Sequence, residues 1–156
     1  MLRHHAIVRG SLIAAATLVV TVGSASASGF GPRFGVTIEP DQLHAGMQFQ
    51  AAQITPQLAF VPGFDVGAGD NAIGVSGNMD FKYTFSQGPQ RWRPYLGGGP
   101  GIFFLDADGH DSATDVGVNF FGGMQTPTHS GLFFAEMRLG LISEPDVKFT
   151  FGWMFR

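Results

Sequence analysis

The stretch from Asn71 to Phe85 alternates apolar and polar residues over its whole length, and it constrains the fold of this chain most strongly. Its apolar positions are Ile73, Val75, Met79, Phe81, Tyr83 and Phe85, with Gly77 in the one gap, and its polar positions are Gly74, Ser76, Asn78, Asp80, Lys82 and Thr84. A period of two places the two sets on opposite faces of a β-strand. Since about 9–11 tilted residues cross a bilayer, the stretch is long enough to span one.

The same alternation recurs along the chain and predicts about eight strands. We expect them near residues 34–39, 44–51, 54–60, 71–85, 93–105, 114–124, 133–141 and 147–156. The Gly- and Asp-rich stretch from Pro62 to Asn71 is expected to be a loop, and Pro56 weakens the third strand because proline cannot donate to a ladder. The sequence therefore predicts an all-β fold, an antiparallel up-and-down transmembrane β-barrel of about eight strands, which leaves no open edge in lipid.

The two faces of the strands differ in a way that favours a membrane over water. Charged residues make up 13% of the chain, against about 25% in soluble domains. The polar faces consist mostly of Gly, Gln, Asn, Ser and Thr, whereas the apolar faces are crowded with Phe and Met, which are too bulky for a narrow interior. We therefore expect the apolar faces to point outward. The alternative is a soluble exported ligand-binding barrel with the faces reversed.

The N-terminus has the three parts of a secretory signal peptide. Arg3 and Arg9 supply the positive region, residues 11–22 form a short apolar core, and Ala25-Ser26-Ala27 provides the small-residue cleavage pattern. We expect cleavage after Ala27. The chain is thus divided into a signal peptide, residues 1–27, and a barrel domain, residues 28–156.

Three short motifs resemble strands of the small OmpA/OmpX-like outer-membrane β-barrel proteins. Residues 94–101, Pro-Tyr-Leu-Gly-Gly-Gly-Pro-Gly, resemble the Pro-Tyr-x-Gly-x-Gly-x-Gly strand of that family. Residues 134–138 resemble its Phe-x-Glu-x-Arg strand, and residues 149–155 resemble its aromatic C-terminal insertion signal. The resemblance implies a location in the bacterial outer membrane and a structural or interaction role at the cell envelope.

Charged residues of both signs fall on the face that would line the lumen. They are Arg33, Glu39, Asp80, Lys82, Arg93, Asp115, Glu136, Arg138 and Lys148. Burying an unpaired charge costs several kcal/mol, so we expect a network of ion pairs in a lumen filled by side chains. The alternative interpretation is an ion-selective pathway.

Acidic residues gather in the segments expected to form the outer loops, near residues 40–43, 61–70, 105–113 and 143–146. This predicted acidic rim consists of Asp41, Asp65, Asp70, Asp106, Asp108, Asp111, Glu144 and Asp146. One interpretation is that this rim binds outer-membrane lipid, including lipopolysaccharide, through bridging divalent cations. The alternative is that the acidic residues only keep the loops soluble. The formal net charge of −3 gives no reason to expect nucleic acid, and we expect a monomer.

Two motifs suggest chemistry but do not have the required spacing. Residues 106–111 depart from the EF-hand pattern because the glycine comes too early and residue 117 is glycine, so no metal site and no cofactor are expected. His129, Ser130 and Glu136 are similar to the set used by outer-membrane lipid deacylases. Adjacent strand residues point to opposite faces, so His129 and Ser130 cannot easily share a proton. We expect no enzyme, with a lipid-modifying deacylase kept as the alternative.

Overall fold

The computed structural model describes residues 29–39, 41–69, 72–85, 91–107, 113–142 and 147–155. The predicted signal peptide lies outside these residues. The described strands are β1 (Gly29–Ile38), β2 (Gln42–Gln50), β3 (Ala52–Gln53), β4 (Leu58–Gly69), β5 (Ala72–Thr84), β6 (Arg93–Ala107), β7 (Ala113–Thr128), β8 (Gly131–Ile142) and β9 (Val147–Phe155). No helix within the described ranges is long and apolar enough to cross a membrane.

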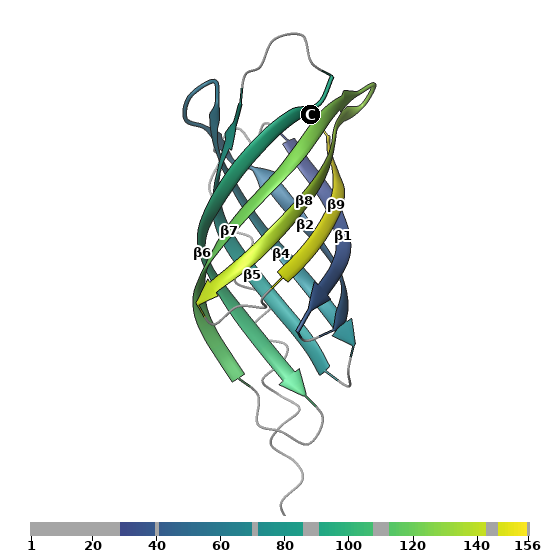
Figure 1. Cartoon of the computed structure of the whole chain (residues 1–156), viewed down its shortest axis with the longest axis vertical. Coiled ribbons are helices and arrows are strands. Elements are labelled where there is room, and N and C mark those ends of the chain that lie inside the picture. The colour runs from purple at the N-terminus through teal and green to yellow at the C-terminus, as the bar shows by residue number, and fades with distance from the viewer. Residues whose placement is uncertain are drawn as a thin grey trace, which may run out of the picture.

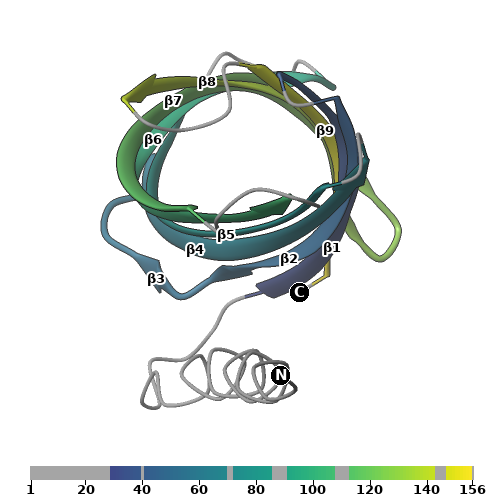
Figure 2. The same cartoon turned by 90° about the horizontal axis from the view of Figure 1, so that it is seen from below.

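The strands form one closed antiparallel sheet. Each long strand pairs with the next along the chain, β9 pairs with β1, and the pairing of β2 with β4 completes the ring. The two-residue β3 pairs with β4 and lies outside the ring (Figure 2). Within the described residues, eight long strands therefore make an up-and-down barrel, and they run steeply tilted around it (Figure 1). This confirms the predicted fold.

The barrel has two distinct ends. At the loop end, β1 turns into β2 and the connections β4–β5, β6–β7 and β8–β9 are made. At the terminus end, β1 begins, β9 ends, and the connections β2–β4, β5–β6 and β7–β8 are made. Glu39 makes the tight β1–β2 turn with φ at 57°, a left-handed conformation that is uncommon for a residue other than glycine.

Strand β5 shows which face points outward. Ile73, Met79 and Phe81 are exposed on the barrel wall, whereas Asn78 and Asp80 are buried in the lumen. The same burial alternation marks β1 and β9. The apolar faces therefore point outward, as predicted, and the reversed faces of a soluble barrel are not observed.

The prediction for residues 54–71 is wrong in its boundaries. Residues 54–57 form bends, and strand β4 continues to Gly69 through the segment predicted as a loop. Its whole length pairs with β5, and Pro62 lies opposite Met79. The glycines here alternate with apolar residues and face a crowded lumen, so their density reflects the small space inside and not a turn.

Apolar side chains close the lumen towards the terminus end. One buried cluster consists of Ala59, Val61, Leu132 and Met154, and a second consists of Tyr95, Phe121 and Phe134. Glycines make room for the rings of the second cluster. A Cβ on Gly123 would lie 2.6 Å from the Tyr95 hydroxyl oxygen, and one on Gly152 would overlap the ring of Phe134. Large and small residues thus alternate to fill the narrow interior.

Candidate functional site

Arg138 is the centre of a network in the middle of the lumen. Its Nη2 donates to Asp80 Oδ2 at 2.7 Å and to Glu136 Oε1 at 3.0 Å, and its Nη1 donates to Asn119 Oδ1 at 2.9 Å. The Tyr95 hydroxyl donates to the other Glu136 oxygen at 3.1 Å. The guanidinium also stacks 4.6 Å from the centre of the Phe121 ring. Partners from β5, β6, β7 and β8 therefore hold one arginine in place across the barrel.

A second network lies nearer the loop end, around Asp65. Arg33 donates to both oxygens of this carboxylate, at 2.7 and 2.9 Å. Lys148 lies 3.8 Å from Asp65 Oδ2 and donates to Ser76 Oγ at 3.0 Å. All four side chains are buried. In the described part of this network, two cations share one carboxylate, so Asp65 is the residue on which its charge balance depends.

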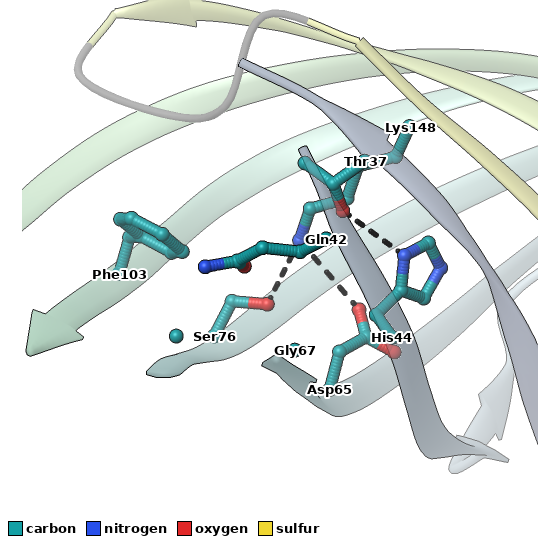
Figure 3. Close-up of a pocket in the computed structure, with 9 residues that line it drawn as sticks. Thr37, Gln42, His44, Asp65, Gly67, Ser76, Phe103 and Lys148 are labelled. Atoms are coloured by element: carbon teal, nitrogen blue, oxygen red, sulfur yellow. Dashed lines mark hydrogen bonds and ion pairs between the residues drawn. The ribbon is translucent and has the colours of Figure 1, made fainter. Parts of the chain in front are cut away.

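His44 completes the loop-end network (Figure 3). Its Nδ1 lies 3.0 Å from the Thr37 hydroxyl and its Nε2 lies 3.0 Å from the Thr150 hydroxyl, so both ring nitrogens have partners. Beside it, the Gln42 side chain points toward Phe103 (Figure 3). These side chains enclose a cavity of about 10 Å³, room for roughly one water molecule. The loop end of the lumen is thus also filled.

Several residues of the two predicted sites lie in other places than predicted. Arg33, Asp80, Lys82, Glu136, Arg138 and Lys148 lie in the lumen. Glu39, Arg93 and Asp115 do not lie in the buried network, because they sit at the two rims, where water reaches them. Asp65, predicted in the acidic rim, is 4% exposed inside the lumen. Asp65 lies two residues from both Gly63 and Gly67, on one face of an alternating segment. This alternation could have identified Asp65 as an inward residue, but the segment was predicted to be a loop.

Few residues of the predicted acidic rim fall in the described ranges. Asp41 is exposed in the β1–β2 turn, and Asp106 is exposed near the loop end of β6. Asp70, Asp108, Asp111, Glu144 and Asp146 lie outside the described residues. Within the described residues, no group of three or more His, Cys, Asp or Glu side chains could hold a metal ion.

The three residues that resemble the set of the lipid deacylases are not close together in the structure. His129 and Ser130 form the exposed turn between β7 and β8 at the terminus end. Glu136 lies six residues beyond Ser130 along β8, which is about 20 Å of extended strand. Its carboxylate is buried and accepts hydrogen bonds from Arg138 and Tyr95. Glu136 therefore does not lie beside His129 and Ser130.

The outer wall is apolar all the way around. Exposed large apolar side chains come from every long strand, among them Phe34, Leu43, Val66, Phe81, Leu96, Val118, Met137 and Phe151. Between the two rims, the outward positions of the described strands carry no Asp, Glu, Lys or Arg. A wall of this kind matches hydrocarbon and not water.

Comparison with known proteins supports the same architecture. No protein-family model and no curated protein matches the sequence. Solved structures do match, among them the N-terminal β-barrel domain of Pseudomonas aeruginosa OprF, with a TM-score of 0.66, and neisserial surface protein A (NspA), with a TM-score of 0.64. Each has 13% sequence identity over 81% of this chain and 94% of the other. This chain has the fold of the small outer-membrane barrels.

In this outer-membrane barrel fold, aromatic side chains gather on the outer wall at the terminus end. Phe133 packs against Trp153 and against Trp92, with ring centres 4.8 and 6.3 Å apart. Phe30 and Phe155 pair where β1 meets β9, at 5.7 Å. Barrels of this kind carry aromatic girdles at the height of the lipid headgroups. The row of rings has the composition of such a girdle and lies at one end of the apolar wall.

Proposed function

We propose that this protein is inserted in the bacterial outer membrane as a monomeric barrel with a structural or interaction role at the cell envelope. The observation that carries the proposal is the uncharged apolar wall, which surrounds the whole barrel and ends in aromatic rings at one rim. Exposed to water, such a wall would be an aggregation surface. In a bilayer it is the surface that stabilises the protein.

The packing of the lumen supports an interaction role over transport. Tyr95, Phe121, Asn119 and Met154 are each no more than 2% exposed, although they point into the barrel. Buried ion pairs link strands across the lumen: Arg138 joins β8 to β5 through Asp80, and Arg33 joins β1 to β4 through Asp65. A solute would have to displace both networks and the apolar clusters. We therefore infer that the protein is not a general porin.

The loop end is the part that we propose contacts other envelope components. Asp41 and Asp106 are exposed there, and the connections beyond Gly69, Ala107 and Ile142 carry further acidic residues. Carboxylates in such numbers suit divalent cations that bridge them to anionic lipid phosphates, as in lipopolysaccharide. The engagement of both Glu136 oxygens by Arg138 and Tyr95 supports a role without catalysis. Unchanged lipid composition in cells with and without the protein would agree with that role, and a deacylated lipid would contradict it.

Insertion tests the proposal directly. Phe81→Arg places a charge on the apolar wall, where an arginine costs up to about 2–4 kcal/mol, so folding into lipid vesicles should fall sharply. Ser130→Arg, in the exposed turn at the terminus end, is the matched control and should fold like the natural protein. Resistance to protease and heat-dependent gel migration report folding. Equal folding of both variants would refute the membrane role, and large steady conductance in planar bilayers would refute the filled lumen.

A further inference from the structure

A groove is hollowed into the outer wall across β7, β8 and β9. Its volume is about 580 Å³, which lies within the range of about 300–1,000 Å³ found for small-molecule sites. The side chains that line it are Trp92, Met124, Ala135, Met137, Phe149 and Phe151, together with Gly122 and the backbone of Gly123 and Glu136. The Glu136 carboxylate points away, into the lumen, where Arg138 and Tyr95 hold it.

The groove exists because two outward positions carry almost no side chain. Gly122 on β7 and Ala135 on β8 form its floor, while the larger Met124, Met137 and Phe151 rise beside them. A Cβ on Gly122 would lie 3.0 Å from a methyl group of Leu96 and 3.9 Å from the Tyr95 carbonyl oxygen, so only the end of the Leu96 side chain would have to shift and the backbone does not require glycine here. The floor is therefore open to an occupant rather than filled by the protein.

Its chemistry and position limit what that occupant can be. Every side chain that reaches the groove from outside is apolar, except for the indole N–H of Trp92. Trp92 lies at the terminus end, in edge-to-face contact with Phe133 of the aromatic row. Indole prefers the membrane interface, where its ring is in hydrocarbon and its N–H can bond to a polar lipid group. The groove thus begins at the height of the headgroups and runs inward along the hydrocarbon.

We propose that this groove is a binding site for one acyl chain of a diacyl phospholipid from the membrane leaflet at the terminus end. The proposal rests on the membrane insertion proposed above. Methionines and aromatic rings provide adaptable walls for a flexible chain, and Trp92 lies where the chain meets its glycerol. A second copy of the barrel is the competing occupant, but it would present a convex wall to this concave floor.

The chain's two tryptophans allow the site to be tested by fluorescence quenching. Trp153→Phe leaves Trp92 as the reporter of the groove, and Trp92→Phe leaves Trp153 as a matched control on the same girdle, since the two are 41% and 38% exposed. Each variant is folded into vesicles containing a low fraction of diacyl phosphatidylcholine brominated on its chains. We expect Trp92 to be quenched more than the bulk fraction of brominated lipid accounts for, and Trp153 in proportion to it.

Filling the groove should remove this preference. Ala135→Leu, made in the Trp153→Phe background, is expected to weaken chain binding by a factor of about 15, because it displaces about two methylene groups and each contributes a factor of about four. Gly122→Leu is a second filling variant. Ala45→Leu adds the same side chain at an outward position of β2, away from the groove, and should leave the preference unchanged.

The remaining outcomes separate this inference from the proposed function. Equal, proportional quenching of both tryptophans would overturn the lipid site and leave membrane insertion intact. No quenching of either tryptophan in folded protein would overturn insertion itself, and the lipid site with it. Quenching of Trp92 that disappears as the protein-to-lipid ratio rises, with crosslinking between copies, would assign the groove to a second barrel and overturn the acyl-chain proposal.

Discussion

Replacing Asp65 by Asn should destabilise the barrel more than any other single loss of a carboxylate near the loop end. The carboxylate is 4% exposed and is held by Arg33 through two short hydrogen bonds, with Lys148 at 3.8 Å. Asparagine keeps the shape of the side chain but removes its charge. Two buried cations of the described network then lose the negative charge that they share.

The size of the effect follows from these contacts. A hydrogen bond to a charged group contributes about 1.5–3 kcal/mol, and Asp65 accepts two of them from Arg33. Removal of one partner from a buried ion pair costs about 3–5 kcal/mol, since the other charge stays buried. We therefore expect Asp65→Asn to lower the free energy of unfolding by about 3–5 kcal/mol.

Urea unfolding in lipid vesicles, followed by tryptophan fluorescence, measures this difference. Asp115→Asn is the control, because Asp115 is an exposed acid at the mouth of the barrel and its loss should change stability by less than about 0.5 kcal/mol. In a double-mutant cycle, Arg33→Met together with Asp65→Asn should cost less than the sum of the single changes. Additive losses, or a small loss for Asp65→Asn alone, would refute the paired network and indicate a water-filled lumen.

Two further predictions concern the packing of the lumen and the loop end. Gly123→Leu should destabilise the barrel by about 1–3 kcal/mol, because a Cβ there would overlap the Ala135 carbonyl oxygen and lie 2.6 Å from the Tyr95 hydroxyl oxygen. Tyr95→Ala in the same chain relieves the second contact and should recover part of the loss; urea midpoints that show no recovery would contradict packing against the Tyr95 ring. Chelation of divalent cations should lower the thermal midpoint in bilayers that contain lipopolysaccharide, and lower it less after Asp106, Asp108 and Asp111 are changed to Asn. An equal decrease in both proteins would exclude these carboxylates as the bridging groups.

The sequence was sufficient to predict the fold where alternation is strong. In β5, a charged or polar residue follows nearly every apolar one, and this alternation alone assigns the inward and outward sets. In β4 the inward positions include Gly63, Gly67 and Gly69, which look like turn residues when read alone. The prediction therefore placed a loop there and put Asp65 on the wrong surface. Glycine is common both in turns and on the crowded inner faces of narrow barrels. The local sequence therefore does not show whether a glycine-rich segment is a turn or a strand.

The partners inside the lumen could not be predicted because they depend on the stagger of strands across the barrel. Arg138 and Asp80 are 58 residues apart, and Lys148 and Ser76 are 72 apart. Such pairs meet only when the closed ring fixes the height of each strand. Rim positions present the same difficulty, since Arg93 and Asp115 point inward by alternation but lie where water reaches them. The groove over Gly122 and Ala135 is formed by side chains of three neighbouring strands, so the sequence of no single strand predicts it.

The central claim is that the apolar face of each strand contacts lipid and the polar face lines a closed lumen. Because the chain has no cysteine, single cysteines placed one at a time along β5 and spin-labelled measure this directly in vesicles. Labels at Val75, Met79 and Phe81 should collide frequently with oxygen dissolved in the bilayer, and labels at Ser76 and Asn78 should be shielded both from oxygen and from a water-soluble nickel chelate. High access of the nickel chelate at Ser76 and Asn78 would show an open aqueous lumen. High access of the chelate at Val75, Met79 and Phe81 would show that the barrel is not in the membrane.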